Sequence, residues 1–293
     1  MRVLVVSDEV AGLTPRASSE LIAGAFERQG AQVAVLPVGE GGATLADALA
    51  TLDRYAEPAV PTTVGEVAAL LVPGPGPLVL DLTAMAVPTL DDLVSGWTRE
   101  SVAAGREALS GRELIGVVPR GQDGLALAGL SGVIAELGRA RGADLAETIR
   151  ENNRAEAWAA DLGEDPAASG AGALGGLGLV ISALGGRVSC GLEFCLDGYG
   201  AREVMRRADV VVAGTAQLDF HDLGGPVVKV LSALAADTQR PLVVLAGRTF
   251  VSSRELRLAG IEAAYAVAPG TGDDSAEAAW AEAADKVAAT WRW

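Results

Sequence analysis

The feature of the sequence best suited to bind a ligand is a glycine-rich stretch near residue 170. Five glycines occur between Ser169 and Gly178, and an apolar run of helical length follows directly. Each glycine inside a helix costs roughly 1 kcal/mol relative to alanine, so the stretch needs a physical reason. One reason is a loop that enters a helix N-terminus and holds a phosphate or carboxylate on its N–H groups. The other is a helix packed so closely that only glycine and alanine fit, and the glycines alone do not separate the two.

The spacing within this stretch invites a dinucleotide-binding interpretation, which the flanking residues exclude. Gly170, Gly172 and Gly175 match G-x-G-x-x-G, and Gly176 follows them. In a dinucleotide-binding fold that motif comes directly after a hydrophobic strand. Here an acidic turn, residues 161–168, precedes it. The four glycines therefore remain candidates for anion binding without a Rossmann fold.

Two aspartates stand where an open parallel sheet would bind a ligand. Asp8 follows the apolar run Val3–Val6, which is typical of a strand buried on both faces. Such sheets bind ligands at the carboxyl ends of their strands, so Asp8 is a candidate catalytic base or metal ligand. Asp219 is a candidate for the same work, although a turn residue capping the next helix would explain it equally well.

Further glycines lie next to predicted strands. Gly41 and Gly42 form a turn after the strand predicted over residues 32–36, and their backbone could hold an anion. Gly214 and Gly247 follow strands predicted over 209–213 and 241–246, which places both at strand ends. We expect these four positions to lie at the ligand-binding edge of a sheet.

The two cysteines, Cys190 and Cys195, lie in an apolar segment with no histidine nearby. This composition favours buried, reduced thiols over a disulfide or a metal site. We assign no metal-ligand set from the sequence.

The order of the predicted elements indicates an α/β protein with two α/β domains. A strand, helix and strand over residues 3–36 form a βαβ unit, and strands alternate with helices again from residue 209 onward. The first unit has too few strands for a stable sheet, so residues 1–70 and 200–293 are predicted to share one doubly wound, mostly parallel sheet. Residues 71–199 then form an inserted α/β domain that carries the glycine-rich stretch, and residues 144–162 are predicted to be an amphipathic helix.

The composition of the chain limits which classes of partner the protein can bind. The chain has 293 residues and a formal net charge of −15, which disfavours nucleic acid and anionic membranes. Its first apolar run is too short for a signal peptide or a membrane span, so we expect a cytoplasmic protein of enzyme size. Only two lysines are present, so a positive clamp would come mostly from arginine, for example Arg120, Arg187 or Arg248.

Four segments in order resemble the bacterial glycerate kinase family, whose members are two-domain α/β kinases unrelated to P-loop kinases. Gly170–Gly178 is similar to the family's P-G-A-G-A-A-G-G-L-G, and Gly191–Asp197 resembles G-I-E-L-V-L-D. Ala208–Gly214 and then Arg240–Gly247, similar to K-P-V-I-A-L-A-G, continue the resemblance. Order and spacing agree over roughly the last 125 residues of the chain.

The resemblance implies an ATP-dependent transferase that phosphorylates glycerate or a related small hydroxy acid with Mg²⁺. It makes Asp219 and Asp8 the candidate catalytic residues. The candidate cofactor-binding residues are Gly170, Gly172, Gly175, Gly176, Gly41, Gly42 and Gly214. The expected partner is a small-molecule hydroxy acid, with neither nucleic acid nor membrane, and a homodimer is left open.

Several polar positions of the family pattern are changed in this chain. Ala11 stands where the family has lysine, Ala43 where it has an acid, and the segment 215–226 has lost charged residues. Removing one preorganised charge beside a transferring phosphoryl group commonly costs about 10² to 10³ in rate. The alternative function is therefore a catalytically degenerate member that binds a small anion or a partner, and we expect weak or absent glycerate phosphorylation.

Overall fold

The computed structural model describes residues 1–219, 221, 223–267 and 276–291. The chain divides into two compact units. Unit 1 comprises Met1–Gly39, Ala43–Thr51 and Cys195–Trp293, and unit 2 comprises Glu40–Gly42 and Leu52–Phe194. Unit 1 thus combines the two ends of the chain, and residues 52–70, grouped with the first domain from the sequence, lie in unit 2.

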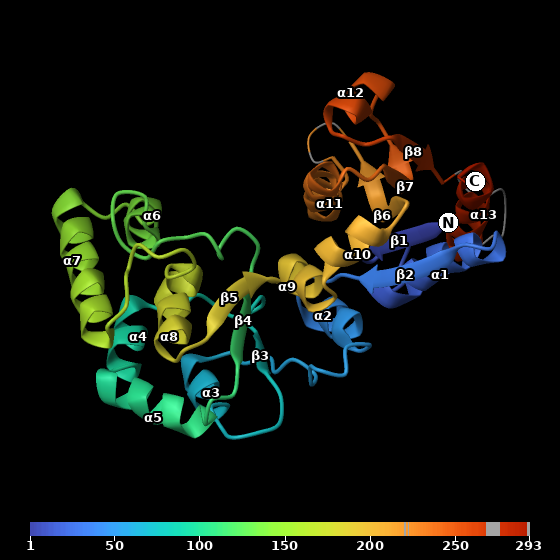
Figure 1. Ribbon diagram of the computed structural model, residues 1–293. Coiled ribbons are helices and arrows are strands. Elements are labelled where there is room, and N and C mark those ends of the chain that lie inside the picture. Colours follow the sequence, from blue (N-terminus) through green and yellow to red (C-terminus); the bar gives the residue numbers. More distant parts are fainter. Residues whose placement is uncertain (220, 222, 268–275, 292–293) are drawn as a thin grey trace. The chain divides into compact units, whose positions relative to one another are not determined.

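Unit 1 contains a five-stranded parallel sheet in the order β2-β1-β6-β7-β8 (Figure 1). Val3 of β1 pairs with Val33 on one side and with Val210 on the other, so β1 lies at the interior of the sheet. The strands are β1 (Arg2–Ser7), β2 (Gln32–Pro37), β6 (Val210–Leu218), β7 (Leu242–Thr249) and β8 (Ala263–Ala266). Their β-branched, buried runs explain the sheet, and the predicted α/β fold is confirmed.

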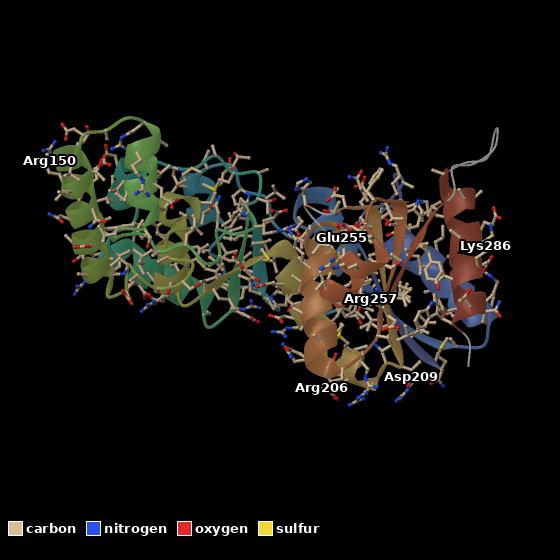
Figure 2. All side chains as sticks on the ribbon, turned by 90° about the horizontal axis from the view of Figure 1, so that it is seen from above. Arg150, Arg206, Asp209, Glu255, Arg257 and Lys286 are labelled. Carbon is tan, nitrogen blue, oxygen red and sulfur yellow. The ribbon has the colours of Figure 1, made fainter. Side chains whose placement is uncertain are left out.

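Helices cover both faces of this sheet. On one face Phe26 of α1 and Trp280 of α13 are buried in one apolar cluster with Val5 and Val243. The helices are α1 (Pro15–Arg28), α2 (Gly42–Leu49), α10 (Ala201–Arg207), α11 (Gly225–Thr238), α12 (Ser253–Leu258) and α13 (Ala276–Thr290). Charged side chains such as Lys286 of α13 and Arg206 of α10 lie on the outside (Figure 2).

Unit 2 has a smaller parallel sheet in the order β3-β4-β5. Its strands are β3 (Leu78–Asp81), β4 (Leu114–Val118) and β5 (Arg187–Cys190). Its helices are α3 (Val64–Ala69), α4 (Leu90–Gly96), α5 (Arg99–Leu109), α6 (Val133–Ala140), α7 (Leu145–Leu162), the 3₁₀ turn η1 (Ala173–Gly176) and α8 (Leu177–Ala183). Helix α9 (Gly191–Gly198) follows β5 and leads into unit 1.

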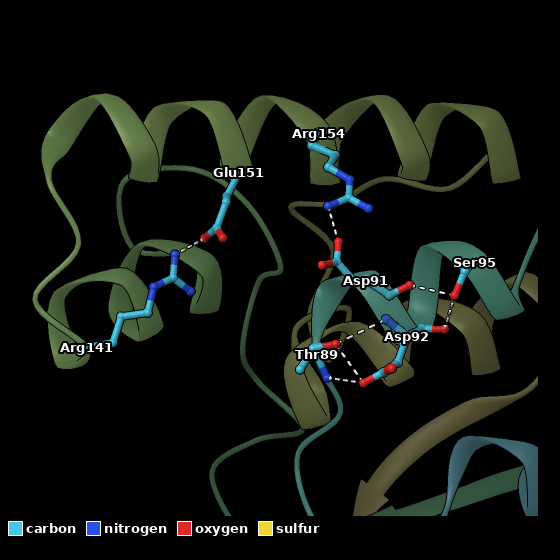
Figure 3. Close-up of polar contacts among 7 residues, drawn as sticks. All are labelled: Thr89, Asp91, Asp92, Ser95, Arg141, Glu151 and Arg154. Carbon is cyan, nitrogen blue, oxygen red and sulfur yellow. Dashed lines mark hydrogen bonds and ion pairs between the residues drawn. The ribbon is translucent and has the colours of Figure 1, made fainter.

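Side-chain caps fix the helix boundaries of unit 2. Asp144 accepts a hydrogen bond from the Glu147 backbone N–H at 2.7 Å and starts α7, so the helix predicted over 144–162 is confirmed. Thr89 and Asp92 form a reciprocal capping box at the start of α4, and Arg154 of α7 pairs with Asp91 beside it (Figure 3).

Among the described residues no helix is long and apolar enough to cross a membrane.

Candidate functional site

The glycine-rich stretch is buried and closely packed within unit 2. Residues 170–181 are all buried. The backbone N–H of Gly172 donates to the Leu125 carbonyl at 2.8 Å, and the N–H of Leu174 donates to Gln122 Oε1 at 2.8 Å. These two amides are therefore used inside the unit, by the loop that follows β4.

The space around three of these glycines explains why no side chain is present. A Cβ atom at Gly178 would lie 1.9 Å from the Gly170 carbonyl oxygen, and one at Gly172 would lie 2.3 Å from that of Ala126. A Cβ at Gly170 would lie 2.3 Å from Val188 Cγ2. The backbone oxygens next to Gly178 and Gly172, and the Val188 side chain next to Gly170, leave no room for a Cβ atom, which supports the close-packing interpretation at these positions. Anion binding by Gly170, Gly172, Gly175 and Gly176 stays a prediction.

Polar residues gather instead at the carboxyl ends of the strands of unit 2. Asp81 ends β3, Arg120 and Asp123 follow β4, and Cys190 ends β5. Because parallel strands end at one edge of their sheet, these residues lie at the edge where such sheets bind ligands. We call Glu40, Asp81, Arg120, Asp123, Cys190 and Glu193 the carboxyl-edge cluster.

The glycine turn after β2 joins this cluster through Asp81. The Gly42 backbone N–H donates to Asp81 Oδ2 at 2.5 Å. Thr83 donates to Asp81 Oδ1 from its N–H at 3.0 Å and from its hydroxyl at 2.6 Å. Asp81 is only 1% exposed, so this buried carboxylate is held by three donors. The Gly42 N–H predicted to bind an anion thus binds the carboxylate of Asp81.

Gly41 is fixed by close contact with Thr83. A Cβ at Gly41 would lie 2.0 Å from Thr83 Oγ1, so a side chain there would displace the threonine. Sequence reasoning missed Asp81, although a carboxylate that ends the apolar run Leu78–Asp81 was a usable signal.

One arginine contributes positive charge to the cluster. Arg120 pairs with Glu40 at 2.5 Å, and both side chains are nearly half exposed. Of the other two arginines considered from the sequence, Arg187 begins β5, away from its carboxyl end, and Arg248 lies in β7 of unit 1. Arg120 is therefore the arginine of the three that stands beside acids of the carboxyl-edge cluster.

Asp123, Cys190 and Glu193 form a compact group. One carboxylate oxygen from each acid and the sulfur of Cys190 lie within 4.8 Å of one another. Burial, and then the charges of Asp123, Glu193 and Glu40, raise the pKa of the Cys190 thiol to about 11, against a hydrogen bond from the Glu193 N–H that lowers it. Both cysteines are buried and neither forms a disulfide, as predicted.

In unit 1 the hydroxyl groups of α1 and β1 position Asp8. Its carbonyl oxygen accepts from Ser18 Oγ at 2.7 Å and from Ser7 Oγ at 3.0 Å. Asp8 itself is partly buried at the end of β1. The backbone of the residue is thereby held at the carboxyl edge of the larger sheet.

The glycines predicted at strand ends in unit 1 lie within longer strands. Strand β6 continues past Gly214 to Leu218, and β7 continues past Gly247 to Thr249. Gly214 pairs with Ser7, and a Cβ there would lie 2.4 Å from Ser7 Oγ. The position predicted for Gly214 at a strand end is wrong, and its missing side chain has a packing reason.

The extension of β6 separates the two predicted catalytic acids along the sheet. Asp8 follows Ser7 and is level with Thr215, whereas Asp219 comes four residues later, roughly 13 Å further along the strand direction. The Asp219 carboxylate accepts from Gln217 Nε2 at 2.8 Å. The register of β1 and β6 therefore does not favour a role for both acids at one reacting atom.

Comparisons with known proteins give a family match, curated relatives and a related solved structure. The model of the glycerate kinase family matches residues 124–292, which is more than half of the chain. Uncharacterized proteins of Mycobacterium bovis and Mycobacterium tuberculosis are 34% identical over 154 residues, covering 50% of this chain and 39% of each relative. The chain thus matches less than half of the length of these relatives.

A solved structure shares the fold. The crystal structure of putative glycerate kinase 2 from Salmonella typhimurium LT2 superposes with a TM-score of 0.63 at 18% identity and covers 99% of this chain and 98% of its own. At that identity the likeness concerns the fold. From the family match over residues 124–292, the chain belongs to the glycerate kinase family.

Proposed function

We propose that the protein is an ATP-dependent kinase that phosphorylates glycerate or a related small hydroxy acid in the cytoplasm. The family supports kinase chemistry. The observation that carries the proposal is the docking of Gly42 onto Asp81, because it brings the Glu40–Gly42 turn to the strand ends of unit 2. In the resemblance described above, that turn begins the segment that stands where the family has D-G-G-E-G-T, with Ala43 in place of the second acid.

The carboxyl-edge cluster contains the side-chain types that phosphoryl transfer uses. Arg120 can bind phosphate oxygens and stabilise the charge that develops on the transferring group. Its ion pair with Glu40 is exposed, and an exposed pair contributes about 1 kcal/mol or less to stability. A phosphate can therefore replace Glu40 as the partner of the Arg120 guanidinium. Asp81, with its carboxylate held by three donors, positions the turn.

The residues present also fit Mg²⁺, which the family implies. Mg²⁺ binds through one or two carboxylates together with water and phosphate oxygens, and Asp123 and Glu193 supply such carboxylates. When bound, Mg²⁺ neutralises charge on the phosphates of the nucleotide. Asp8 and Asp219 of unit 1 stay candidate catalytic residues as alternatives to one another, because the register of β1 and β6 does not favour both at one reacting atom.

A coupled assay of ADP release with ATP, Mg²⁺ and D-glycerate tests the proposal. We expect slow turnover, because several charged positions of the family are changed, and a further fall of at least about 10²-fold in Arg120→Ala, because that variant loses the proposed phosphate-binding charge. Glu107→Gln, an exposed acid of α5, is the matched control and should leave turnover unchanged.

The same assay run with Asp219→Ala tests the role of that acid. A loss of turnover would support a catalytic role, and unchanged turnover would assign Asp219 to the turn. No turnover in the unsubstituted protein, with ATP or glycerate still raising its melting temperature, would contradict the kinase proposal and favour a binding protein on the same scaffold.

A further inference from the structure

We propose that Asp123, Cys190 and Glu193 form a binding site for a thiophilic divalent cation, Zn²⁺. The proposal goes beyond the kinase function. It uses the carboxylates of Asp123 and Glu193 that are proposed above for Mg²⁺, so the two cations would compete for them, and metal binding is measured without turnover.

The geometry of the three side chains is close to that of a metal site. They come from three different places, the loop after β4, the end of β5 and the first turn of α9. Their ligand atoms already lie within 4.8 Å of one another. Tetrahedral Zn²⁺ with bonds of about 2.0 to 2.3 Å needs ligand atoms about 3.5 Å apart, a distance that small side-chain rotations can reach.

The charge around the sulfur favours a cation. The carboxyl-edge cluster holds four carboxylates, those of Glu40, Asp81, Asp123 and Glu193, and one guanidinium, that of Arg120, which leaves a formal charge of −3. Cys190 is 4% exposed, so little water screens its sulfur from the nearby carboxylates of Asp123 and Glu193. A divalent cation would turn repulsion between the thiolate and the acids into attraction to a shared ion.

The thiol decides which cation the site prefers. Mg²⁺ and Ca²⁺ take oxygen ligands and gain little from sulfur. A thiolate with two carboxylates suits Zn²⁺, and three protein ligands leave a fourth position for water or another molecule. The group therefore favours Zn²⁺ over the Mg²⁺ that would accompany a nucleotide at the same edge.

Titration of the chelator-stripped protein with Co²⁺ tests the proposal, because Co²⁺ bound to a thiolate gives a charge-transfer absorption in the near ultraviolet. We expect one such Co²⁺ per chain, displaced by Zn²⁺ and unaffected by a large excess of Mg²⁺. Cys190→Ser should abolish the absorption. Cys195→Ser is the matched control and should retain it, since the Cys195 sulfur lies toward the Gly39 carbonyl oxygen in unit 1.

A second variant covers the case in which Cys190→Ser does not fold. Asp123→Asn keeps the thiol and should weaken Zn²⁺ binding at least about tenfold in competition with a coloured chelator. Absence of the cobalt–thiolate absorption in the unsubstituted protein would overturn the proposal. So would an absorption that persists in a folded Cys190→Ser variant, or Zn²⁺ affinity unchanged in Asp123→Asn.

Discussion

The backbone N–H of Gly42 and the carboxylate of Asp81 form a 2.5 Å hydrogen bond between positions 39 residues apart in the sequence. The bond ties a glycine turn to the end of a buried strand and uses the turn's amide inside the protein. The charge of Asp81 is therefore a structural requirement of the carboxyl-edge cluster, with consequences that can be measured.

Asp81→Asn should lower the free energy of unfolding by about 3 kcal/mol, because an amide cannot accept all three hydrogen bonds that the carboxylate accepts. Urea denaturation measures the change. Asp91→Asn is the control: Asp91 is 78% exposed in its pair with Arg154 (Figure 3), so its loss should cost less than about 1 kcal/mol. An equal decrease in the free energy of unfolding for the two variants would show that the Asp81 carboxylate does not accept the three hydrogen bonds described above.

Gly41→Ala should lower the free energy of unfolding by about 1 to 3 kcal/mol, because the new methyl group would overlap Thr83. Gly65→Ala in α3 has open space and an ordinary backbone conformation, and should be neutral or stabilising by up to about 1 kcal/mol. Thermal and urea unfolding of both variants give the comparison. A Gly41→Ala protein as stable as the parent would contradict the contact with Thr83.

Gly178→Ala separates packing from ligand binding in the glycine-rich stretch. The added Cβ would meet the Gly170 carbonyl oxygen, which is backbone and cannot rotate away, so a loss of about 3 kcal/mol is expected in the absence of any ligand. Gly124→Ala, with nothing nearby, should stay within about 0.5 kcal/mol of the parent. If Gly178→Ala leaves stability intact and weakens ATP binding, anion binding explains the glycine instead.

Cys190 should resist alkylation at neutral pH in metal-free protein. Its pKa is raised from 9.0 to about 11, so iodoacetamide should modify it about ten times faster for each pH unit up to that value. Mass spectrometry of the labelled peptide measures the rate, with urea-unfolded protein as the reference for an ordinary thiol. Rapid labelling of the folded chain at pH 7.5 would disprove the raised pKa.

The same shift has a consequence for stability. A thiol whose pKa is higher in the folded protein stabilises the fold fully below pH 9, and the contribution is lost as the pH rises toward 11. The parent should therefore lose more stability than Cys190→Ser over that interval. Parallel losses in the two proteins would contradict the assignment.

The sequence alone predicted the helices and strands that short local patterns of residues indicate. The β-branched runs at Val3–Val6 and Val210–Val212 predicted strands of one shared sheet, and the structure pairs Val3 directly with Val210. The amphipathic pattern of residues 144–162 likewise predicted α7. The last part of β6 was missed, because Ala216 and Gln217 are exposed and extended only through pairing with β7.

The candidate site depended on contacts that no local pattern encodes. Asp81, Asp123 and Cys190 are far apart in the chain and lie at one edge of a sheet because β3, β4 and β5 are adjacent and parallel. The order of strands in a sheet follows from packing of the helices that connect them, which periodicity does not give. For the same reason the Glu40–Gly42 turn was assigned to the first domain, although its contacts lie in unit 2.

The interior position of β1 affects how the chain is made. Strand β1 leaves the ribosome with β2, but its other neighbour, β6, follows about 200 residues later. At about 5 to 20 residues per second, that interval lasts roughly 10 to 40 s. Throughout it the nascent chain carries an apolar strand with one unpaired edge. We therefore expect translation products that stop before Val210 to aggregate through Val3–Val6.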